Sequence, residues 1–283
     1  GYSVAMDGDT VVVGAYYKNS GEGAVYVLRT TDGATYVEVA KLTASDAESG
    51  DQFGFSVAID GHTIVVGTRG GEAAYIFHTS DDGATYIEIA KLTASGAAAY
   101  DSFGISVAID GSTVVVGATG DDSYRGAVYV FRTSDGGATY GQVAKLTAAD
   151  AAVHDSFGIS VAIAGATIVV GTWGGEAAYI FHTSDGGATY VELSKLTADD
   201  AASWDDFGFS VAIDGATVVA GAYSDNPGGS AYVFGANLPT PQPTSRPTVP
   251  APTAAPTFTK APTPKPTSKC SVVTFAWKQD IKT

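Results

Sequence analysis

The side chains that could perform chemistry are few, and their spacing does not assemble a catalytic site. The four histidines, at positions 62, 78, 154 and 182, lack the spacing of metal ligands. Arg29 and Arg132 occupy a repeated position that histidine fills in other units, which we interpret as surface variation. There is no nucleophile elbow, phosphate-binding loop or Ser–His–Asp order that would support nucleophilic catalysis. The sequence therefore predicts a protein that is not an enzyme and needs no cofactor.

Aromatic and charged residues in variable loops could instead bind a ligand. Arg69 is replaced by Trp173 within two otherwise matching loops. Four different residues, Gly50, Tyr100, His154 and Trp204, stand immediately before four recurring aspartates. Such variation on a rigid scaffold suits a recognition surface, although unselected loop drift would look the same. The predicted ligand-binding residues are Tyr16, Tyr17, Arg69, Tyr100, Tyr124, Arg125, Trp173, Trp204 and Tyr223.

A repeat of about 50 residues must position these side chains. Phe53, Phe103, Phe157 and Phe207 each open a unit, and "GYSVAMDG" at the start is the same opening without its Phe. There are thus five units, of which the first and last are incomplete. Units two and four match each other best, as if a pair had been duplicated, so we expect an intact parent of six or seven units.

Each full unit predicts four short strands. In the third unit they are Ile105–Ile109, Thr113–Gly117, Ala127–Arg132 and Thr139–Leu146, joined by turn residues. No segment has helical periodicity. The second strand is apolar throughout and the fourth alternates, so each sheet must stack on its neighbours. We therefore predict an all-β fold, a β-propeller of four-stranded antiparallel blades over residues 1–237.

At these residues the chain resembles the FG-GAP repeat family. The segments "DSFGISVAIDGSTVVVGA", "GAVYVFRT" and "VAKLTA" recur in order, and they resemble the blades of integrin-α-type propellers. The resemblance is closest to the variant without the integrin calcium loop, and the proline of the "GAP" motif is absent. It implies a propeller fold and a protein or glycan ligand.

A second resemblance lies between the third and fourth strands. "TSDGGATY" at 133–140 and 183–190, "TSDDGATY" at 79–86 and the shorter "TTDGATY" at 30–36 are similar to the Asp-box. Turn chemistry explains this motif, because the Asp side chain accepts hydrogen bonds from backbone N–H groups. The motif is also common in sialidases, so a glycoside hydrolase stays open as an alternative. Such an enzyme would need a carboxylate pair or a Tyr–Glu pair near the axis.

Calcium is the one metal that the sequence leaves open. Integrin-type blades hold it in a D-x-D/N-x-D-G loop between the first two strands, whereas this connection is only Asp-Gly. We therefore interpret Asp7, Asp60, Asp110 and Asp214 as turn residues and expect no metal in these hairpins. The recurring Asp before each Phe-Gly is predicted to orient that turn. The acidic loops could still collect an ion without the family motif.

The alternating direction of the strands places the variable loops together. The one-to-two and three-to-four turns share one end of the sheets, and the other loops share the opposite end. We therefore predict a non-catalytic recognition or adhesion module that binds a protein or glycan through its variable loop end. A purely structural spacer is a further alternative.

Charge and proline content indicate which partners to exclude and where the protein is located. Residues 1–238 hold 29 acidic and 9 basic residues, so nucleic acid and anionic membranes are poor partners. No apolar run is long enough to span a bilayer. Ten of the 11 prolines lie within 239–266, which predicts an extended Pro/Thr-rich linker at 238–269 before an unassigned segment at 270–283. Together these features predict an extracellular or cell-surface protein, and Thr beside Pro is typical of O-glycosylated stalks.

The last unit lacks a fourth strand, and a closed ring needs one. The N-terminus is the usual donor, so we expect an N-terminal truncation. The segment "SVVTFAW" at 271–277 could supply this strand, although we expect it to be the first strand of a following domain.

Overall fold

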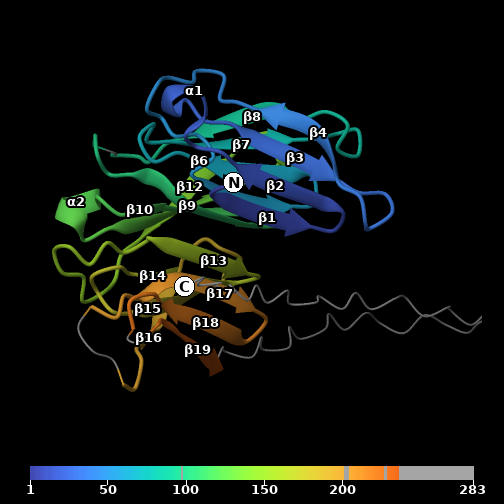
Figure 1. Cartoon of the computed structure of the whole chain (residues 1–283). Coiled ribbons are helices and arrows are strands. Elements are labelled where there is room, and N and C mark those ends of the chain that lie inside the picture. Colours follow the sequence, from blue (N-terminus) through green and yellow to red (C-terminus); the bar gives the residue numbers. More distant parts are fainter. Residues whose placement is uncertain (97, 201–203, 226–227, 236–283) are drawn as a thin grey trace, which may run out of the picture. The chain divides into compact units, whose positions relative to one another are not determined.

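The computed structural model describes residues 1–96, 98–200, 204–225 and 228–235. In this part of the chain, 19 strands form five antiparallel sheets, four of them with four strands and the last with three (Figure 1). Strand order within every sheet follows the sequence. The all-β prediction is confirmed. The expected linker, the C-terminal segment and the strand at 271–277 lie outside the described residues.

The sheets share one pattern of strands. The first contains β1 (Ser3–Asp7), β2 (Thr10–Gly14), β3 (Val25–Arg29) and β4 (Val37–Leu42). The second contains β5 (Ser56–Asp60), β6 (Thr63–Gly67), β7 (Ala74–His78) and β8 (Ile87–Leu92). The third contains β9 (Phe103–Asp110), β10 (Thr113–Ala118), β11 (Ala127–Arg132) and β12 (Gly141–Leu146). The fourth contains β13 (Ser160–Ala164), β14 (Thr167–Gly171), β15 (Ala178–His182) and β16 (Val191–Leu196). The last contains β17 (Phe207–Asp214), β18 (Thr217–Ala222) and β19 (Ser230–Gly235).

Two short helical turns, which the sequence did not predict, interrupt the longer loops of units one and three. They are α1 (Lys18–Gly21) and α2 (Asp121–Tyr124), each of four residues. Three of the four residues in each turn have positive φ, so neither is a regular helix. Both lie at the same end of the sheets (Figure 1).

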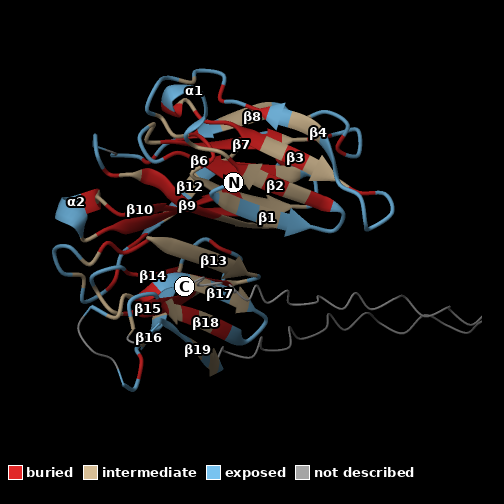
Figure 2. Ribbon diagram, in the orientation of Figure 1, coloured by how far each residue is buried: buried red, intermediate tan, exposed pale blue. Residues whose placement is uncertain are grey.

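Consecutive sheets pack through their first strands. β1 lies beside β5, β5 beside β9, β9 beside β13, and β13 beside β17. Between neighbouring sheets lie clusters of buried apolar side chains, each including the recurring Phe, such as Phe53 or Phe157. The second and third strands of the middle sheets are buried on both faces (Figure 2). Stacked four-stranded units whose first strands converge are the blades of a β-propeller.

The recurring Ser and Gly residues are explained by contacts between blades. Ser56 Oγ donates a hydrogen bond of 2.8 Å to the carbonyl oxygen of Gly104 in the next blade, and Ser3, Ser106 and Ser160 make the equivalent bond at 2.7–2.9 Å. A Cβ atom on Gly67 would lie 2.1 Å from that same carbonyl oxygen. The repeated letters therefore encode a close approach of two backbones.

The Asp-Gly hairpins link neighbouring blades at the other end. Asp7 Oδ2 accepts a hydrogen bond of 2.7 Å from the backbone N–H of Gly61, and Asp60 accepts the equivalent bond at 2.5 Å from Gly111. Asp110 accepts from Gly165 in the same way. The prediction that they are turn residues is wrong by one position, because each is the last residue of its strand and pairs across a turn formed by the next two residues. Each carboxylate instead holds the turn of the next blade. Unit four has Ala164 at this position, so its hairpin offers no carboxylate to the last blade.

The two terminal sheets each leave one apolar face exposed. On the first sheet Val4 and Met6 are exposed, and their cross-strand neighbours Val13 and Val11 are only half-buried. On the last sheet Val233 is exposed beside Val219. In the middle sheets the equivalents of Val11, Val13, Val219 and Val233 are buried, and those of Val4 and Met6 are buried or half-buried.

Candidate functional site

The variable loops gather at one end of the blades, which we call the rim. The rim comprises the loops after the second strand of each sheet and the connections between sheets. Backbone hydrogen bonds join the two kinds of loop: Gly120 N–H donates to Asp101 (2.8 Å), and Trp173 N–H donates to Asp155 (3.0 Å). The predicted grouping of variable loops at one end is therefore confirmed.

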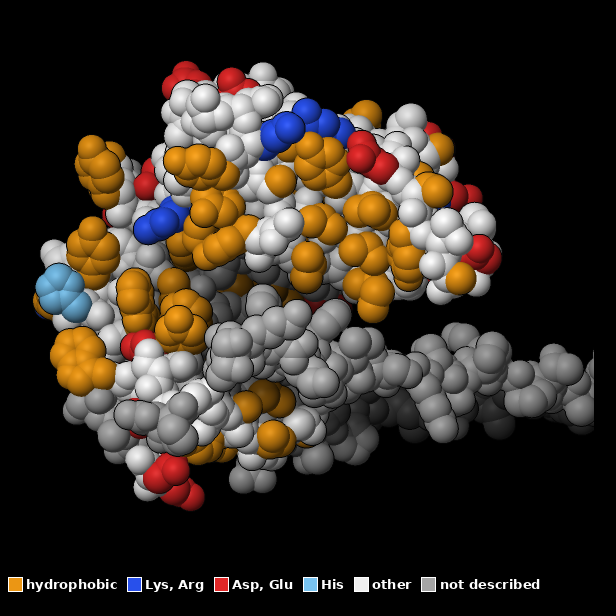
Figure 3. Space-filling model, viewed as in Figure 1, with side chains coloured by type: hydrophobic (Ala, Val, Ile, Leu, Met, Phe, Trp, Pro, Cys, Tyr) orange, Lys and Arg blue, Asp and Glu red, His pale blue; other side chains and the backbone are white. Residues whose placement is uncertain are grey.

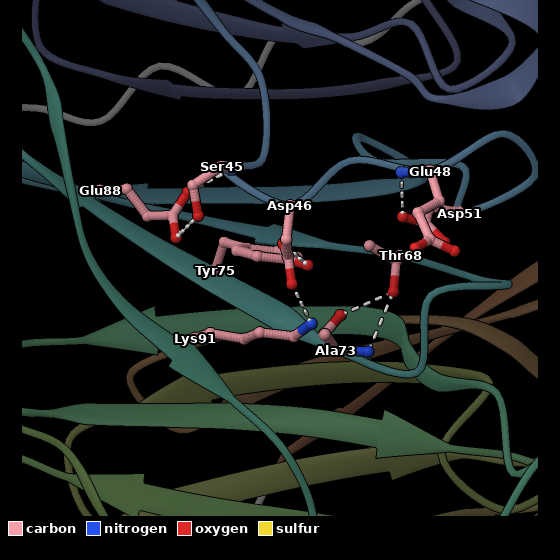
Figure 4. A network of polar contacts seen from close by, with 9 residues as sticks. All are labelled: Ser45, Asp46, Glu48, Asp51, Thr68, Ala73, Tyr75, Glu88 and Lys91. Carbon is pink, nitrogen blue, oxygen red and sulfur yellow. Dashed lines mark hydrogen bonds and ion pairs between the residues drawn. The ribbon is translucent and has the colours of Figure 1, made fainter.

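In three connections the side chain of the recurring aspartate holds the turn before it, whereas we predicted that it orients the Phe-Gly turn after it. Asp51 Oδ2 accepts a hydrogen bond of 2.7 Å from the backbone N–H of Glu48 (Figure 4). Asp101 and Asp155 accept the equivalent bond from the residue three positions earlier, also at 2.7 Å. This carboxylate is thus occupied in holding a turn, which fixes the residue before it.

The residue before that aspartate forms the apex of each connection. Tyr100, His154 and Trp204 have φ values of 75°, 74° and 77°, and Gly50 has a φ of 97°. The left-handed region costs a non-glycine residue about 1–2 kcal/mol. Tyr100 and Trp204 are 84% and 80% exposed, so burial of their rings does not offset this cost. Outliers of this kind cluster at functional sites.

The loop of the preceding blade holds the backbone beside the apex. In short loops a glutamate does this: Glu176 accepts hydrogen bonds from the N–H groups of Trp204 (3.0 Å) and Phe207 (2.9 Å). One pair of blades earlier, Glu72 accepts hydrogen bonds from the N–H groups of Ser102 (3.0 Å) and Phe103 (2.9 Å). Burial raises the pKa of the Glu72 carboxyl, although backbone donors oppose the shift. In the long loop around α2, the carbonyls of Tyr124 and Arg125 accept the equivalent bonds.

A Tyr–Asp–Lys set supports the rim, and sequence reasoning missed it. Tyr75 Oη donates to Asp46 (2.8 Å), and Lys91 Nζ lies 2.6 Å from the same carboxylate (Figure 4). Burial raises the pKa of Tyr75 to about 12, so this phenol stays protonated and donating. Tyr179, Asp150 and Lys195 repeat the set, whereas the third unit takes Asp121 from α2. The signal was a Tyr and a Lys at fixed positions in successive units.

The predicted site residues fall into separate groups. Near the first two blades, Tyr16 contacts Tyr17 (5.8 Å between ring centroids), and the Arg69 guanidinium lies 5.6 Å from the ring centroid of Phe55. Tyr100 belongs to no ring cluster of the described residues.

The other predicted residues lie near the last three blades. Phe209, which the sequence reasoning missed, lies between Trp173 and Tyr223, with ring centroids 6.2 Å and 5.4 Å away. The Tyr124 ring stacks on His154, with centroids 5.7 Å apart. Arg125 is paired with Asp122 at 3.3 Å.

Near the last three blades the rim forms a hollow. Its volume is about 530 Å³, and it is lined by Tyr124, His154, Trp173, Trp204, Asp206 and Ser224 among others. Figure 3 shows hydrophobic side chains, with a histidine among them, along this end of the molecule. We call this hollow the aromatic pocket. The sequence placed three of these residues on the site, Tyr124, Trp173 and Trp204, but could not show that they share one cavity.

The opposite end of the blades is built from four turns that carry the Thr-x-Asp sequence, which we call the aspartate turns. In the second, the Asp81 carboxylate accepts hydrogen bonds from the Thr79 and Thr85 hydroxyls (2.8 and 2.7 Å) and from the Thr85 N–H. These bonds lower the pKa of Asp81 to about 2. The same bonds recur around Asp135 and Asp185, and Asp32 accepts from the Thr30 hydroxyl and the Thr35 N–H.

Arg29 and Arg132 at this end are not simple surface variation. Both are half-buried, and Arg132 donates to the carbonyl of Gly186 in the next aspartate turn. Arg29 lines a hollow of about 570 Å³ together with Asp32 and Asp82. Each arginine therefore packs a strand end against its neighbouring blade.

The described residues offer neither a cluster of metal ligands nor a helix that could span a membrane. They hold no cluster of three or more His, Cys, Asp or Glu residues placed to bind a metal ion. Within the same residues, no helix has the length and apolar character needed to cross a membrane.

Comparison with known proteins identifies the family of the repeat. A model of the FG-GAP repeat matches residues 1–28, 36–87, 86–131, 140–192 and 190–234. Among solved structures, the chain is similar to a protein from Bacteroides uniformis that is named a putative 6-phosphogluconolactonase. The TM-score is 0.62 at 13% identity, with 83% of this chain and 67% of that chain covered, so this likeness concerns the fold alone. A comparison with curated proteins gave no match.

Proposed function

Because the chain belongs to the FG-GAP repeat family, we propose that it is a non-catalytic recognition or adhesion module that binds a protein or glycan through its rim. One observation carries the proposal: aromatic side chains occupy the apexes of the rim in a left-handed conformation, which costs stability, and two of them are largely exposed. A spacer would gain nothing from them, since Gly50 fills the equivalent position without strain.

Acid–base chemistry receives less support. A general acid or base needs a pKa close to the working pH. Among the described carboxyl groups whose pKa shifts are resolved, most have a lowered pKa. Glu72, whose pKa is raised, accepts two backbone hydrogen bonds that hold the rim. The name of the structural neighbour adds no support for an enzyme, because that likeness is one of fold alone.

An extracellular or cell-surface location fits this function. The Pro/Thr-rich composition of residues 238–269 is that of a stalk, which would hold the rim away from a surface. The acidity of the repeats argues against nucleic acid and anionic membranes as partners.

The test is a binding screen of the full chain on protein and glycan arrays, repeated with a Trp173→Ala/Trp204→Ala variant. We expect at least one ligand class to bind and the double variant to lose it. Binding that is unchanged in a folded double variant would remove the aromatic pocket as the site. Blank screens on both arrays would favour the spacer, and turnover of fluorogenic glycosides would favour the hydrolase.

A further inference from the structure

Two of the apex residues belong to the aromatic pocket. His154 and Trp204 both line it, and both adopt a left-handed conformation that glycine adopts more easily. The connection between the first two blades has Gly50 at this position, so an aromatic side chain is not needed to form the turn. The two rings at the pocket are therefore features that the fold tolerates rather than requires.

The rings around the pocket are held in place. Tyr124 and His154 stack with an interplanar angle of 28°, and they come from two different loops. Trp173 stands edge-on to Phe209. The backbone N–H of Trp204 is bonded to Glu176, which in turn bonds Phe207. The rings of Tyr124, His154 and Trp173 thus rest against other rings, and Trp204 is held through its backbone, before any ligand arrives. Such order reduces the entropy lost on binding.

The polar groups of the pocket are few and uncharged or acidic. Ser224 Oγ donates a hydrogen bond of 2.6 Å to Asp206, so hydroxyl and carboxylate oxygens lie together at one side. The basic neighbour Arg125 is paired with Asp122. With 29 acidic residues against 9 basic ones in residues 1–238, an anionic ligand would be repelled.

These features match the chemistry of a neutral sugar. A pyranose ring has an apolar C–H face, which packs on an aromatic ring. Its hydroxyl groups point outward and form hydrogen bonds with carboxylate and hydroxyl oxygens. A volume of about 530 Å³ lies within the range of pockets that bind small ligands. A basic peptide would suit the acidity of the chain, but among the residues that line this pocket its cations would find a single carboxylate, Asp206.

We propose that the aromatic pocket binds a neutral oligosaccharide, with Trp173 and Trp204 as stacking platforms and Asp206 as a hydrogen-bond acceptor for its hydroxyl groups. Glu176 is a positioning residue that holds Trp204. The inference rests on the proposed recognition function and narrows it to one ligand class and one part of the rim.

The test applies the full chain to an array of neutral, sialylated and sulfated glycans, followed by calorimetric titration of the strongest neutral oligosaccharide. The Trp204→Gly variant is the main probe, because Gly50 shows that glycine fits this position. We expect binding at least 10-fold weaker with an unchanged or higher melting temperature. Trp173→Ala should also weaken binding at least 10-fold, and Tyr36→Ala, an exposed aromatic at the opposite end, should leave it unchanged.

Four other results would contradict this inference or the proposed function. Neutral-glycan binding that survives Trp204→Gly overturns this site. Binding only to sialylated or sulfated glycans overturns the ligand class. Binding of proteins but not glycans, lost in the Trp173→Ala/Trp204→Ala variant, overturns this inference and leaves the proposed function standing. Blank glycan and protein arrays overturn both.

Discussion

The two ends of the blades are built in opposite ways. In the aspartate turns, the side chains and the hydrogen bonds repeat together: Asp81, Asp135 and Asp185 each accept from the threonines on both sides. At the rim the backbone repeats while the apex side chain changes, since φ stays between 74° and 77° for Tyr100, His154 and Trp204. A surface whose side chains change over an unchanged backbone can alter its ligand without altering its fold.

The largest effect is expected where two backbones pack closely beneath the rim. If this packing keeps the rim backbone the same from blade to blade, adding a single methyl group there should be costly. A Cβ atom on Gly104, at φ +100°, would lie 2.4 Å from the Ala73 carbonyl oxygen, whereas Gly111 in the hairpin at the opposite end has open space around it. We expect Gly104→Ala to lower the free energy of unfolding by about 3 kcal/mol or more, because backbone strain adds to overpacking. Gly111→Ala should cost about 1 kcal/mol. Urea denaturation measures both, and equal losses would contradict the comparison.

The Tyr–Asp–Lys sets provide the next test of the rim supports. Asp121 is 9% exposed and accepts a hydrogen bond of 2.5 Å from Tyr129, whereas the Asp46 side chain, which serves Tyr75, is 50% exposed. Removing a partner from a buried polar group costs about 1–3 kcal/mol. We therefore expect Tyr129→Phe to cost up to about 3 kcal/mol and Tyr75→Phe about 1 kcal/mol. Denaturant titration measures both losses in the free energy of unfolding. A larger loss for Tyr75→Phe than for Tyr129→Phe would show that burial does not determine how much each hydrogen bond contributes.

The apex residues give a smaller effect of the opposite sign. Trp204→Gly should leave the free energy of unfolding unchanged or raise it by about 1 kcal/mol, since strain is relieved while little burial is lost. The reverse change, Gly50→Trp, should lower it by a similar amount. Thermal melts of both variants measure this pair. A clear loss of stability in Trp204→Gly would mean that the indole supports the fold.

The smallest effect concerns acid stability at the opposite end. Folding lowers the pKa of Asp81 from 3.8 to about 2, so its contribution is complete above pH 4 and is lost as the pH falls toward 2. Asp81→Asn should therefore narrow the difference between the denaturation midpoints at pH 5 and pH 2.5. Asp82→Asn is the matched control and should not narrow this difference, because the Asp82 side chain is 94% exposed and its ion pair with His62 spans 3.8 Å. If both variants behave alike, the aspartate turn does not govern this acid response.

Much of the fold could be predicted because the local pattern determines it. The strand Ala127–Arg132 was predicted with its observed bounds. The next strand begins at Gly141 rather than Thr139, because both the N–H and the hydroxyl of Thr139 are bonded to Asp135 in the turn. The helical turns α1 and α2 escaped prediction because residues of positive φ interrupt each of them.

Contacts between blades could not be predicted in the same way. Ser106 and Gly158, or Asp60 and Gly111, are about 50 residues apart, and periodicity says that they recur but not that they meet. The site shows the same limit. The sequence selected Trp173 and Trp204 as exposed and variable, yet the pocket they share with His154 follows only from packing of adjacent blades.

The alanine at position 164 predicts which junction between blades unfolds first. The first three junctions between blades are fastened by a carboxylate at the hairpin end, and the fourth is fastened by the Ser160–Gly208 bond without one. In a chain of units that contact only their neighbours, opening starts at the weakest junction. Amide hydrogens of β17–β19 should therefore exchange with solvent before those of the middle sheets. Under a stretching force, the last sheet should peel away as the first step.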